Sequence, residues 1–321
     1  MKRIPILLLA ASVLAASLTA CGSPAASSSS APPSSAPSSA FQGYTFTDDL
    51  GRTVTVEQPE RVAALIGSFA DVWCLAGGQD TLVAAAHDAW TSFDLGLSDT
   101  AADLGAVKEP NLEVLLAAQP DFILASCNTT ADLELESTFE SAGIPTAYFD
   151  IQSFDDYLNM LKICTDLTGC PENYETYGLQ VQEQVEAAKA RQDGSAPTVL
   201  TIRATGSNCK VKGSQDFLLG EMLSDLGCVN VADSETSLLE ELSLESILAA
   251  DPDYIFVVLQ GSDATDAQET LEKTLLSNPA WGSLRAVQEG RFHTLEHSLY
   301  NLKPNARWGE AYDKLADILY P

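Results

Sequence analysis

The pattern of hydrophobic and polar positions predicts helices and strands along this chain. One segment, a short helix followed by a buried strand, occurs twice. Residues 111–126 read NLEVLLAAQPDFILAS and residues 243–258 read SLESILAADPDYIFVV, and eight of the first thirteen aligned positions are identical. In each copy the spaced Leu and Ala residues predict about two helical turns, and a proline ends the helix before a continuous apolar run. Such a run is typical of a parallel strand that is covered on both faces.

The distance between the copies indicates the domain organisation. They lie 132 residues apart, which is too long for a solenoid and fits two lobes of one kind. Asn111 and Ser243 can accept hydrogen bonds from the first helical turn, where Glu113 and Glu245 also suit the helix dipole.

The rest of the chain predicts the same alternation of strand and helix around both copies. A hairpin is expected at 44–56, further strands at 61–66, 82–86, 146–149, 198–203, 229–231 and 291–295, and helices at 68–75, 133–142, 154–167, 216–226, 267–276 and 305–319. Residues 174–192 are free of proline and rich in Glu, Gln, Ala and Lys, which predicts a helix of roughly 28 Å. The predicted fold is α/β, with two Rossmann-like lobes that have parallel central sheets and are joined by one long α-helix, and with a ligand cleft between the lobes. A single helical crossing is stiff, so modest lobe movement is expected.

The start of the chain predicts export. Lys2 and Arg3 precede an apolar run that is too short for a stable membrane span, and Leu18-Thr19-Ala20-Cys21 resembles a bacterial lipoprotein cleavage site. An ordinary secretory leader with a chance cysteine is the alternative. We expect a lipoprotein signal peptide at 1–20, a lipid-bearing Cys21 with a disordered Ser/Pro/Ala tether at 21–40, an N-terminal lobe at 41–170, the bridging helix at 171–194 and a C-terminal lobe at 195–321. The expected location is the outer face of the cytoplasmic membrane, with the lipid anchor as the membrane attachment.

Charge and cysteine content narrow the range of partners. The formal net charge is −28, which repels nucleic acid and anionic lipid headgroups and suits docking on a basic protein. Six of the seven cysteines follow Cys21, and none has CxxC spacing, which argues against a zinc ribbon. A disulfide between Cys164 and Cys170 and free buried thiols are both compatible with the sequence.

Candidate ligand residues come from the expected carboxyl ends of the strands, where parallel α/β sheets bind their ligands. They are Ser68, Phe69, His87, Trp90, Asn128, Arg203, Lys210, Lys212, His297 and Tyr300. The three cations lie within ten residues of one another in an acidic chain, which predicts an anionic ligand, although both lysines could instead be solvated. Trp90 and Tyr300 could stack on a flat ligand. His87 and His297 could ligate the metal of a chelate or of haem, or act as polar residues without metal.

Known enzyme motifs would indicate a different class of protein. The sequence contains no GxSxG, GxxxxGK[ST], GxGxxG or HExxH motif. We therefore expect no catalytic residues and no permanently bound cofactor. An enzyme or a surface sensor built on the same two-lobed scaffold remains the alternative of a different class.

Several segments together resemble a known family, the helical-linker solute-binding lipoproteins of ABC importers for iron complexes and cobalamin. The resemblance covers 41–321 and rests on TDDLGRTVTV, PERVAAL, the two LE…LAA.PD copies and GRFHTLEHSLYNLKPNARWGEAY. It implies that the chain binds a metal chelate between its lobes and delivers it to a permease. It also implies that Glu113 and Glu245 dock into basic pockets of the permease dimer. The ligand implied first is a ferric siderophore or haem, and a corrinoid is second.

Overall fold

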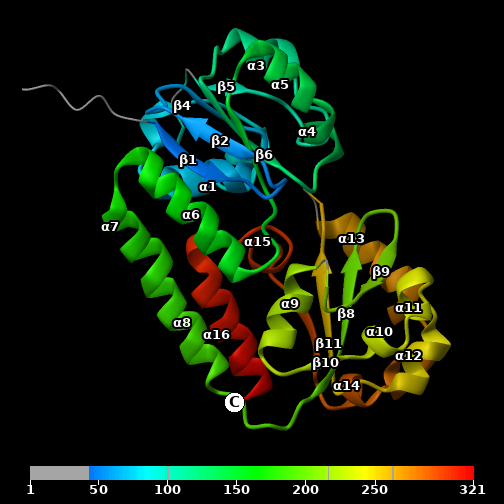
Figure 1. Ribbon diagram of the computed structural model, residues 1–321. Coiled ribbons are helices and arrows are strands. Elements are labelled where there is room, and N and C mark those ends of the chain that lie inside the picture. Colours follow the sequence, from blue (N-terminus) through cyan, green and yellow to red (C-terminus); the bar gives the residue numbers. More distant parts are fainter. Residues whose placement is uncertain (1–42, 98, 100, 216, 262–263) are drawn as a thin grey trace, which may run out of the picture. The chain divides into compact units, whose positions relative to one another are not determined.

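Two sheets, one in each half of the chain, organise the structure (Figure 1). The computed structural model describes residues 43–97, 99, 101–215, 217–261 and 264–321. The predicted signal peptide, Cys21 and the tether lie outside the described residues. Within these described ranges, no helix combines the length and the apolar character that a membrane crossing requires.

The first sheet is parallel throughout and has the strand order β5-β4-β3-β6-β7. Its strands are β3 (Val62–Ala64), β4 (Leu82–Ala85), β5 (Ala102–Asp103), β6 (Phe122–Ser126) and β7 (Thr146–Phe149). The helices of this lobe are α1 (Gly67–Leu75), α2 (Asp88–Thr91), α3 (Leu112–Ala117), α4 (Thr130–Glu134), α5 (Glu136–Ala142) and α6 (Phe154–Thr168), with a short 3₁₀ turn η1 (Gln79–Thr81). The predicted hairpin is confirmed as β1 (Tyr44–Thr47) and β2 (Thr53–Val56). Every residue of β3 and β6 is buried, as the continuous apolar runs predicted.

The second sheet repeats this plan with one addition. Its strands β10 (Val229–Asn230), β8 (Thr198–Ala204), β11 (Tyr254–Leu259) and β12 (Phe292–Leu295) are parallel in that order. Its helices are α9 (Leu218–Asp225), α10 (Val231–Ser234), α11 (Ser237–Glu240), α12 (Leu244–Ala250), α13 (Ala264–Leu271), α14 (Arg285–Gln288), α15 (His297–Tyr300) and α16 (Trp308–Leu319), with short turns η3 (Glu272–Leu276), η4 (Pro279–Ser283) and η5 (Asn305–Arg307). The two-sheet α/β fold predicted from the sequence is confirmed.

The addition is a strand that was not among those predicted from the sequence. Residues Cys209–Lys212 form β9, which pairs antiparallel with β8. Cys209 and Val211 are buried while Lys210 is exposed, so the segment has the period-two pattern of a half-buried strand. A four-residue run that is half lysine carries too little apolar signal to be recognised as a strand by itself.

The two repeat copies fold alike, starting with their helix caps. The side chain of Asn111 accepts a hydrogen bond from the backbone N–H of Val114 at 3.1 Å, and Ser243 accepts one from Ser246 at 3.2 Å. Both copies therefore begin with the predicted N-cap.

Each copy also ends in the same way. The residue before the proline takes a left-handed backbone conformation, with φ of 48° at Gln119 and 36° at Asp251, so the chain turns sharply from helix to strand. The aspartate after the proline then binds the start of a neighbouring strand: Asp121 accepts from the backbone N–H of Arg61 at 3.0 Å, and Asp253 accepts from that of Thr198 at 2.8 Å. The repeated Pro-Asp pair thus aligns two strands in each lobe.

The predicted bridge is a run of consecutive helical segments. α7 (Pro171–Tyr174), a π-helical turn η2 (Glu175–Leu179) and α8 (Gln180–Lys189) follow one another directly. α8 lies along α16 (Figure 1). A Cβ added to Gly309 of α16 would lie 2.6 Å from the Cβ of Gln184, so this glycine permits the close approach of the two helices.

A single hydrophobic core joins the two lobes. It includes Leu161 of α6, Val185 of α8, Leu219 of α9, Phe256 of β11 and Leu315 of α16. Two smaller clusters cover the other faces of the sheets, one in the first lobe and one in the second. The bridge and the C-terminal helix are therefore parts of this shared core.

Polar contacts fix the segment that leads into α16 onto the first lobe. Asn305 is fully buried, and its amide donates to the carbonyl of Ser68 at 2.8 Å and to a carboxylate oxygen of Asp71 at 2.7 Å. The Lys303 ammonium donates to the carbonyl of Ile151, and burial lowers the pKa of Lys303. These bonds attach the second half of the chain to α1 and to the loop after β7.

The shared core predicts that the two lobes unfold together. Leu315→Ala, at a position with 0% exposure, should lower the free energy of unfolding by about 2–5 kcal/mol because it leaves a cavity in that core. Urea unfolding followed by tryptophan fluorescence and by circular dichroism should give coincident transitions for the parent and for the variant. Leu50→Ala, at a position that is 39% exposed, is the control and should change stability by less than about 0.5 kcal/mol. Two separate transitions, with Leu315→Ala moving one of them, would contradict the prediction.

Candidate functional site

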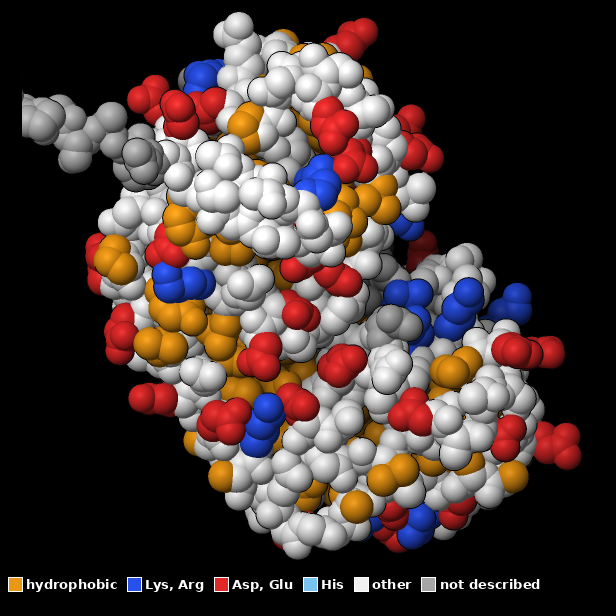
Figure 2. Space-filling model, viewed as in Figure 1, with side chains coloured by type: hydrophobic (Ala, Val, Ile, Leu, Met, Phe, Trp, Pro, Cys, Tyr) orange, Lys and Arg blue, Asp and Glu red, His pale blue; other side chains and the backbone are white. Residues whose placement is uncertain are grey.

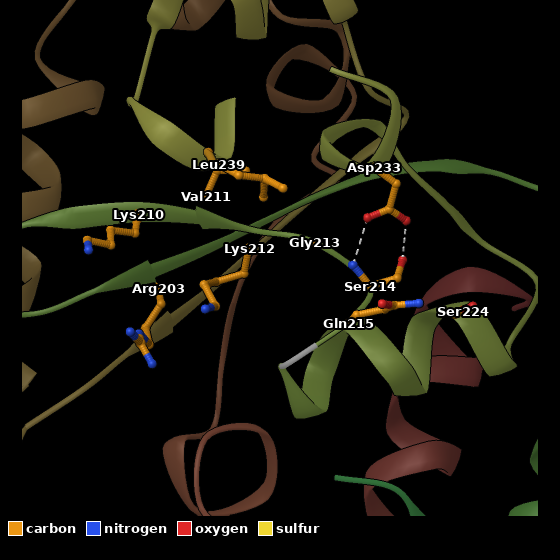
Figure 3. Close-up of a pocket in the computed structure, with 10 residues that line it drawn as sticks. All are labelled: Arg203, Lys210, Val211, Lys212, Gly213, Ser214, Gln215, Ser224, Asp233 and Leu239. Carbon is orange, nitrogen blue, oxygen red and sulfur yellow. Dashed lines mark hydrogen bonds between the residues drawn. The ribbon is translucent and has the colours of Figure 1, made fainter. Parts of the chain in front are cut away.

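A cavity of about 720 Å³ lies at the carboxyl end of β8 in the second lobe (Figure 3). It is bounded by β8, by β9 and by the loop that leads into α9. Its lining residues are Arg203, Lys210, Val211, Lys212, Gly213, Ser214, Gln215, Ser224, Asp233 and Leu239. The structure therefore brings together the three cations that the sequence analysis selected.

The strand register explains why these cations share one surface. Arg203 and Lys210 are directly opposite each other across the β8–β9 pair, and Lys212 follows two residues later on the same face of β9. We call Arg203, Lys210 and Lys212 the cationic face. Figure 2 shows Lys and Arg side chains gathered on this part of the second lobe.

The cationic face carries positive charge that is only partly compensated. In the part of the chain that the structure describes, no carboxylate pairs with Arg203 or Lys210. The Lys212 ammonium lies 5.8 Å from the centre of the Phe217 ring. Like charges directly opposite each other on two strands repel, so a bound anion would relieve this repulsion.

Among the described residues that line the cavity, Asp233 is the one carboxylate, and the loop before α9 holds it. Ser214 donates to Asp233 from its backbone N–H at 2.9 Å and from its hydroxyl at 2.6 Å, as Figure 3 shows. Gly220 lets this loop lie against α9, because a Cβ there would come within 2.2 Å of the Gly213 carbonyl oxygen. Asp233 is thus engaged by Ser214.

A second pocket, of about 530 Å³, lies between the two lobes. The first lobe supplies Thr91 and Ser92, and the second supplies Gln260, Gly261, Glu296, His297, Ser298, Asn301 and Leu302. The structure thus contains a pocket at the predicted place between the lobes. It is bordered by α2 on one side and by α15 and the end of β11 on the other.

His297 is oriented in this pocket by the backbone. Its Nδ1 lies 2.9 Å from the carbonyl oxygen of Leu259. A carbonyl can only accept, so Nδ1 carries the proton in the neutral ring and Nε2 keeps its lone pair. The neighbouring Glu296 forms ion pairs with Arg307 and Lys314, both at 3.1 Å. The pKa of Glu296 is lowered, first by the hydrogen bond from Ser298 and then by the one from Lys314.

The other predicted histidine has a different environment. Nδ1 of His87 lies 2.7 Å from a carboxylate oxygen of Asp103, and both side chains are about half exposed. His297 lines the pocket between the lobes, whereas His87 is not among its lining residues. Among the residues that the structure describes, no group of three or more His, Cys, Asp or Glu side chains is placed to hold a metal ion.

Two further predicted residues lie on the first lobe. Asn128 lines a third pocket of about 380 Å³ together with Val107, Lys108, Thr129, Thr130 and Ala131, and its amide donates to Asp150 at 2.5 Å. Trp90 is half-buried and packs against the shared core.

Three predicted ligand residues are instead parts of the core. Ser68 is 2% exposed, Phe69 is 1% exposed and Tyr300 is 1% exposed. Phe69 meets Phe149 edge to face, with ring centres 6.1 Å apart, and the Tyr300 hydroxyl donates to the carbonyl of Ala311 at 2.9 Å. The prediction of ligand contacts by these side chains is therefore wrong for this structure. These residues were chosen because they follow the ends of strands in the sequence. That position does not show whether a side chain on the following helix faces the pocket or the core.

Several pocket residues are absent from the set predicted from the sequence. Ser214, Gln215, Asp233, Ser298 and Asn301 were all left out, and each lines one of the two larger pockets. The polar triplet Gly213-Ser214-Gln215 after the alternating β9 residues was the available signal for the first of them.

The six described cysteines are free thiols. The disulfide considered between Cys164 and Cys170 is therefore absent, and the alternative of free thiols is the one observed. Cys164 lies in the shared core, where burial raises the pKa of its thiol.

Comparison with known proteins identifies the family. A family model described as periplasmic binding protein matches residues 62–299. The chain belongs to the periplasmic binding protein family.

Similar proteins cover most of this periplasmic binding protein. The iron-uptake system-binding protein of Bacillus subtilis (strain 168) is 25% identical over 222 residues, 68% of this chain and 67% of that protein. The Fe(3+)-citrate-binding protein YfmC of the same strain is 24% identical over 262 residues, 79% of this chain and 78% of that protein. The solved siderophore-binding protein BauB has the same fold, with a TM-score of 0.70 and 20% identity over 87% of this chain and 99% of that chain.

A buried carboxyl next to the third pocket predicts a pH dependence of stability. Asp132 has 0% exposure, and burial raises its pKa to about 7, against the effect of a hydrogen bond from the backbone of Ser126. The folded protein therefore binds this proton more tightly than the unfolded chain. As the pH rises from about 4 to about 7, the unfolded chain loses this proton while the folded protein keeps it, so the free energy of unfolding should fall.

Asp132→Asn should remove this part of the pH dependence, because an amide keeps the acceptor for the Ser126 N–H and does not ionise. At pH 8 the variant should be more stable by about 1–3 kcal/mol, and the difference should shrink towards pH 4 in chemical denaturation series. Asp80→Asn, at an exposed position, controls for the loss of one acidic group. Equal pH profiles for the parent and Asp132→Asn would contradict the prediction.

Proposed function

We propose that this periplasmic binding protein is the extracytoplasmic substrate-binding component of an ABC importer and that it captures an anionic ferric chelate. The chelate class that the site supports best is a ferric siderophore with carboxylate or other anionic oxygens. Haem, which carries two propionates, is included in the proposal. The lipid anchor at Cys21 is a further part of it and rests on the LTAC sequence.

The observation that carries this proposal is the cationic face. Arg203 is opposite Lys210 on adjacent strands, Lys212 follows on the same face, and the cavity beside them has a volume of about 720 Å³. Guanidinium groups bind carboxylates through two parallel hydrogen bonds, which gives both energy and orientation. In a chain with a net charge of −28, a local group of cations favours an anionic cargo.

The names of the relatives support the same class of cargo. Two of them are named for iron uptake and for Fe(3+)-citrate, and a solved neighbour is named as a siderophore-binding protein. Other relatives are named as vitamin B12-binding proteins, so a corrinoid is the second candidate. A corrinoid offers fewer anionic groups to the cationic face than a ferric carboxylate does.

Arg203→Ala should weaken binding of ferric citrate by about 10- to 100-fold, because it removes one charge-assisted bidentate contact. Isothermal titration of the purified full-length protein, with ferric citrate as the probe, measures this change. The loss should be smaller at high salt, since part of the attraction is screened. Arg291→Ala is the matched control, because Arg291 immediately precedes β12 and lies at the opposite edge of the parallel sheet.

Equal weakening by both arginine variants would contradict a specific role for Arg203.

Titrations with haem and with cobalamin test the other two cargo classes. Tight binding of cobalamin that does not change in Arg203→Ala would replace the proposed cargo with a corrinoid. For haem, His297 is the candidate axial ligand, because its Nε2 keeps the lone pair, and loss of the bound-haem absorption spectrum in His297→Ala would test that role.

Delivery to the permease is proposed to depend on Glu113 and Glu245. Both are exposed on the first turns of matched helices, α3 and α12. In the described part of the chain, neither is held in an ion pair. Two like carboxylates, one per lobe, fit a partner that offers a basic pocket on each of two subunits.

Glu113→Ala combined with Glu245→Ala should abolish import of radiolabelled iron by the host, because both charges that orient docking are removed. The affinity for ferric citrate should be unchanged, since neither residue lines a described pocket. Glu140→Ala combined with Glu272→Ala removes the same charge from other exposed positions and should leave import intact. Normal import by the first double variant would refute the docking role.

A further inference from the structure

A carboxylate shares the cavity with the cationic face without pairing with it. Asp233 lines this cavity and has an exposed side chain, yet among the described residues it takes part in no ion pair. Opposite charges in one cavity attract each other, and pairing would neutralise part of the cationic face. The structure therefore has to hold Asp233 in another orientation.

The loop at residues 213–215 provides that orientation. The Ser214 N–H donates to Oδ1 of Asp233 and the Ser214 hydroxyl donates to Oδ2, as the dashed lines in Figure 3 show. A Cβ on Gly213 would lie 2.8 Å from Oδ1 of Asp233, so a side chain at this position would push the carboxylate off the loop. Because both oxygen atoms are bound by one residue, the carboxylate is fixed in direction as well as in place.

A buried asparagine fixes Asp233 relative to the cationic face. Asn230 is 3% exposed, and its side-chain oxygen accepts from the backbone N–H of Ala232 at 3.0 Å, at the start of the helix α10 that carries Asp233. The amide nitrogen of Asn230 donates to the carbonyl of Lys212 at 3.0 Å. One side chain thus connects α10 to β9, so the separation between the carboxylate and the cations is set before a ligand binds.

A cavity that held cations alone would favour the wrong form of an anionic chelator. The carboxylates of an iron-free chelator carry their full charge, whereas those of the ferric form bind the metal, whose positive charge partly neutralises them. Cations therefore attract the iron-free form more strongly. A fixed carboxylate in the same cavity opposes this preference, because it repels the more negative form more.

We propose that Asp233, held by Ser214, is a specificity-determining residue that favours the iron-loaded chelator over its iron-free form. The cationic face supplies the attraction for anionic oxygens, and Asp233 disfavours a ligand whose charge no metal compensates. This inference rests on the proposed function and adds to it the state of the cargo that the site selects.

The test compares the affinities of the purified full-length protein for ferric citrate and for iron-free citrate by isothermal titration. Asp233→Asn should raise the affinity for iron-free citrate about tenfold and that for ferric citrate about threefold or less, and both gains should shrink at high salt. The amide can still accept from the Ser214 N–H and can donate to the Ser214 hydroxyl oxygen, so the loop is kept. Glu240→Gln removes the same charge from an exposed position of α11 that does not line the cavity. This control should leave the ratio of the two affinities unchanged.

A second variant tests how Asp233 is held. Ser214→Ala removes one of the two bonds, so that the carboxylate can turn towards the cations, and it should weaken binding of both forms of citrate about threefold. In the Asp233→Asn background the same serine substitution should have no further effect. Equal weakening in both backgrounds would mean that Ser214 acts on the ligand itself, and the positioning role would be overturned.

The outcomes separate this inference from the proposed function. If ferric citrate binding depends on Arg203 but Asp233→Asn changes both affinities by the same factor, or neither, the selective role is refuted and the proposed function stands. If Asp233→Asn weakens both, the carboxylate attracts the ligand and the inference is overturned. If the parent binds neither form of citrate, haem or cobalamin, the proposed function fails and this inference fails with it. Thermal unfolding of each variant shows that the lobe is intact.

Discussion

The packing of α16 against the bridge helix α8 is the constraint on which the rest of the structure depends. These two helices place Val185 and Leu315 in one core with residues of α6, α9 and β11, so neither lobe completes its core alone. An ion pair between Arg191 and Asp317 of α16, at 2.7 Å, reinforces this contact, and Lys189 of α8 pairs with Asp225 of α9 at 2.9 Å. Because the end of the chain is packed against its middle, the relative position of the two sheets is set by side-chain packing and not by a flexible linker.

This arrangement leaves the carboxyl edges of the sheets free to form the two larger pockets, which are the proposed binding surfaces. The pocket between the lobes takes residues from α2 on one side and from α15 on the other, and the cationic face lies on the second lobe beside β9. Buried contacts behind these surfaces, such as the Asn305 amide on Ser68 and Asp71, hold the segment before α16 in place. Under the proposed function, such contacts would order the pocket residues before a ligand binds, which would reduce the entropic cost of binding.

The duplicated segment combines residues that the fold uses with glutamates that the proposed function assigns to docking. Its proline and aspartate turn the chain and align a neighbouring strand in each lobe, through the hydrogen bonds of Asp121 and Asp253. Its glutamate, which makes no described ion pair, lies on the opposite, exposed side of the same short helix. Residues of both kinds are identical in the two copies, and only their burial and contacts separate the structural from the exposed ones.

The sequence alone determined the α/β class, the positions of nearly all long helices and strands, the bridge near 174–192 and the group of cations. These features depend on local periodicity, on caps such as Asn111 and on proline, which act over a few residues. Only the tertiary structure decided that Phe69 and Tyr300 are core residues, that Lys210 and Lys212 lie on a strand and that Asp233 is engaged by Ser214. Those outcomes depend on which helix face meets the core and on which strands pair across the sequence, and such contacts arise between segments whose local patterns do not encode their partners.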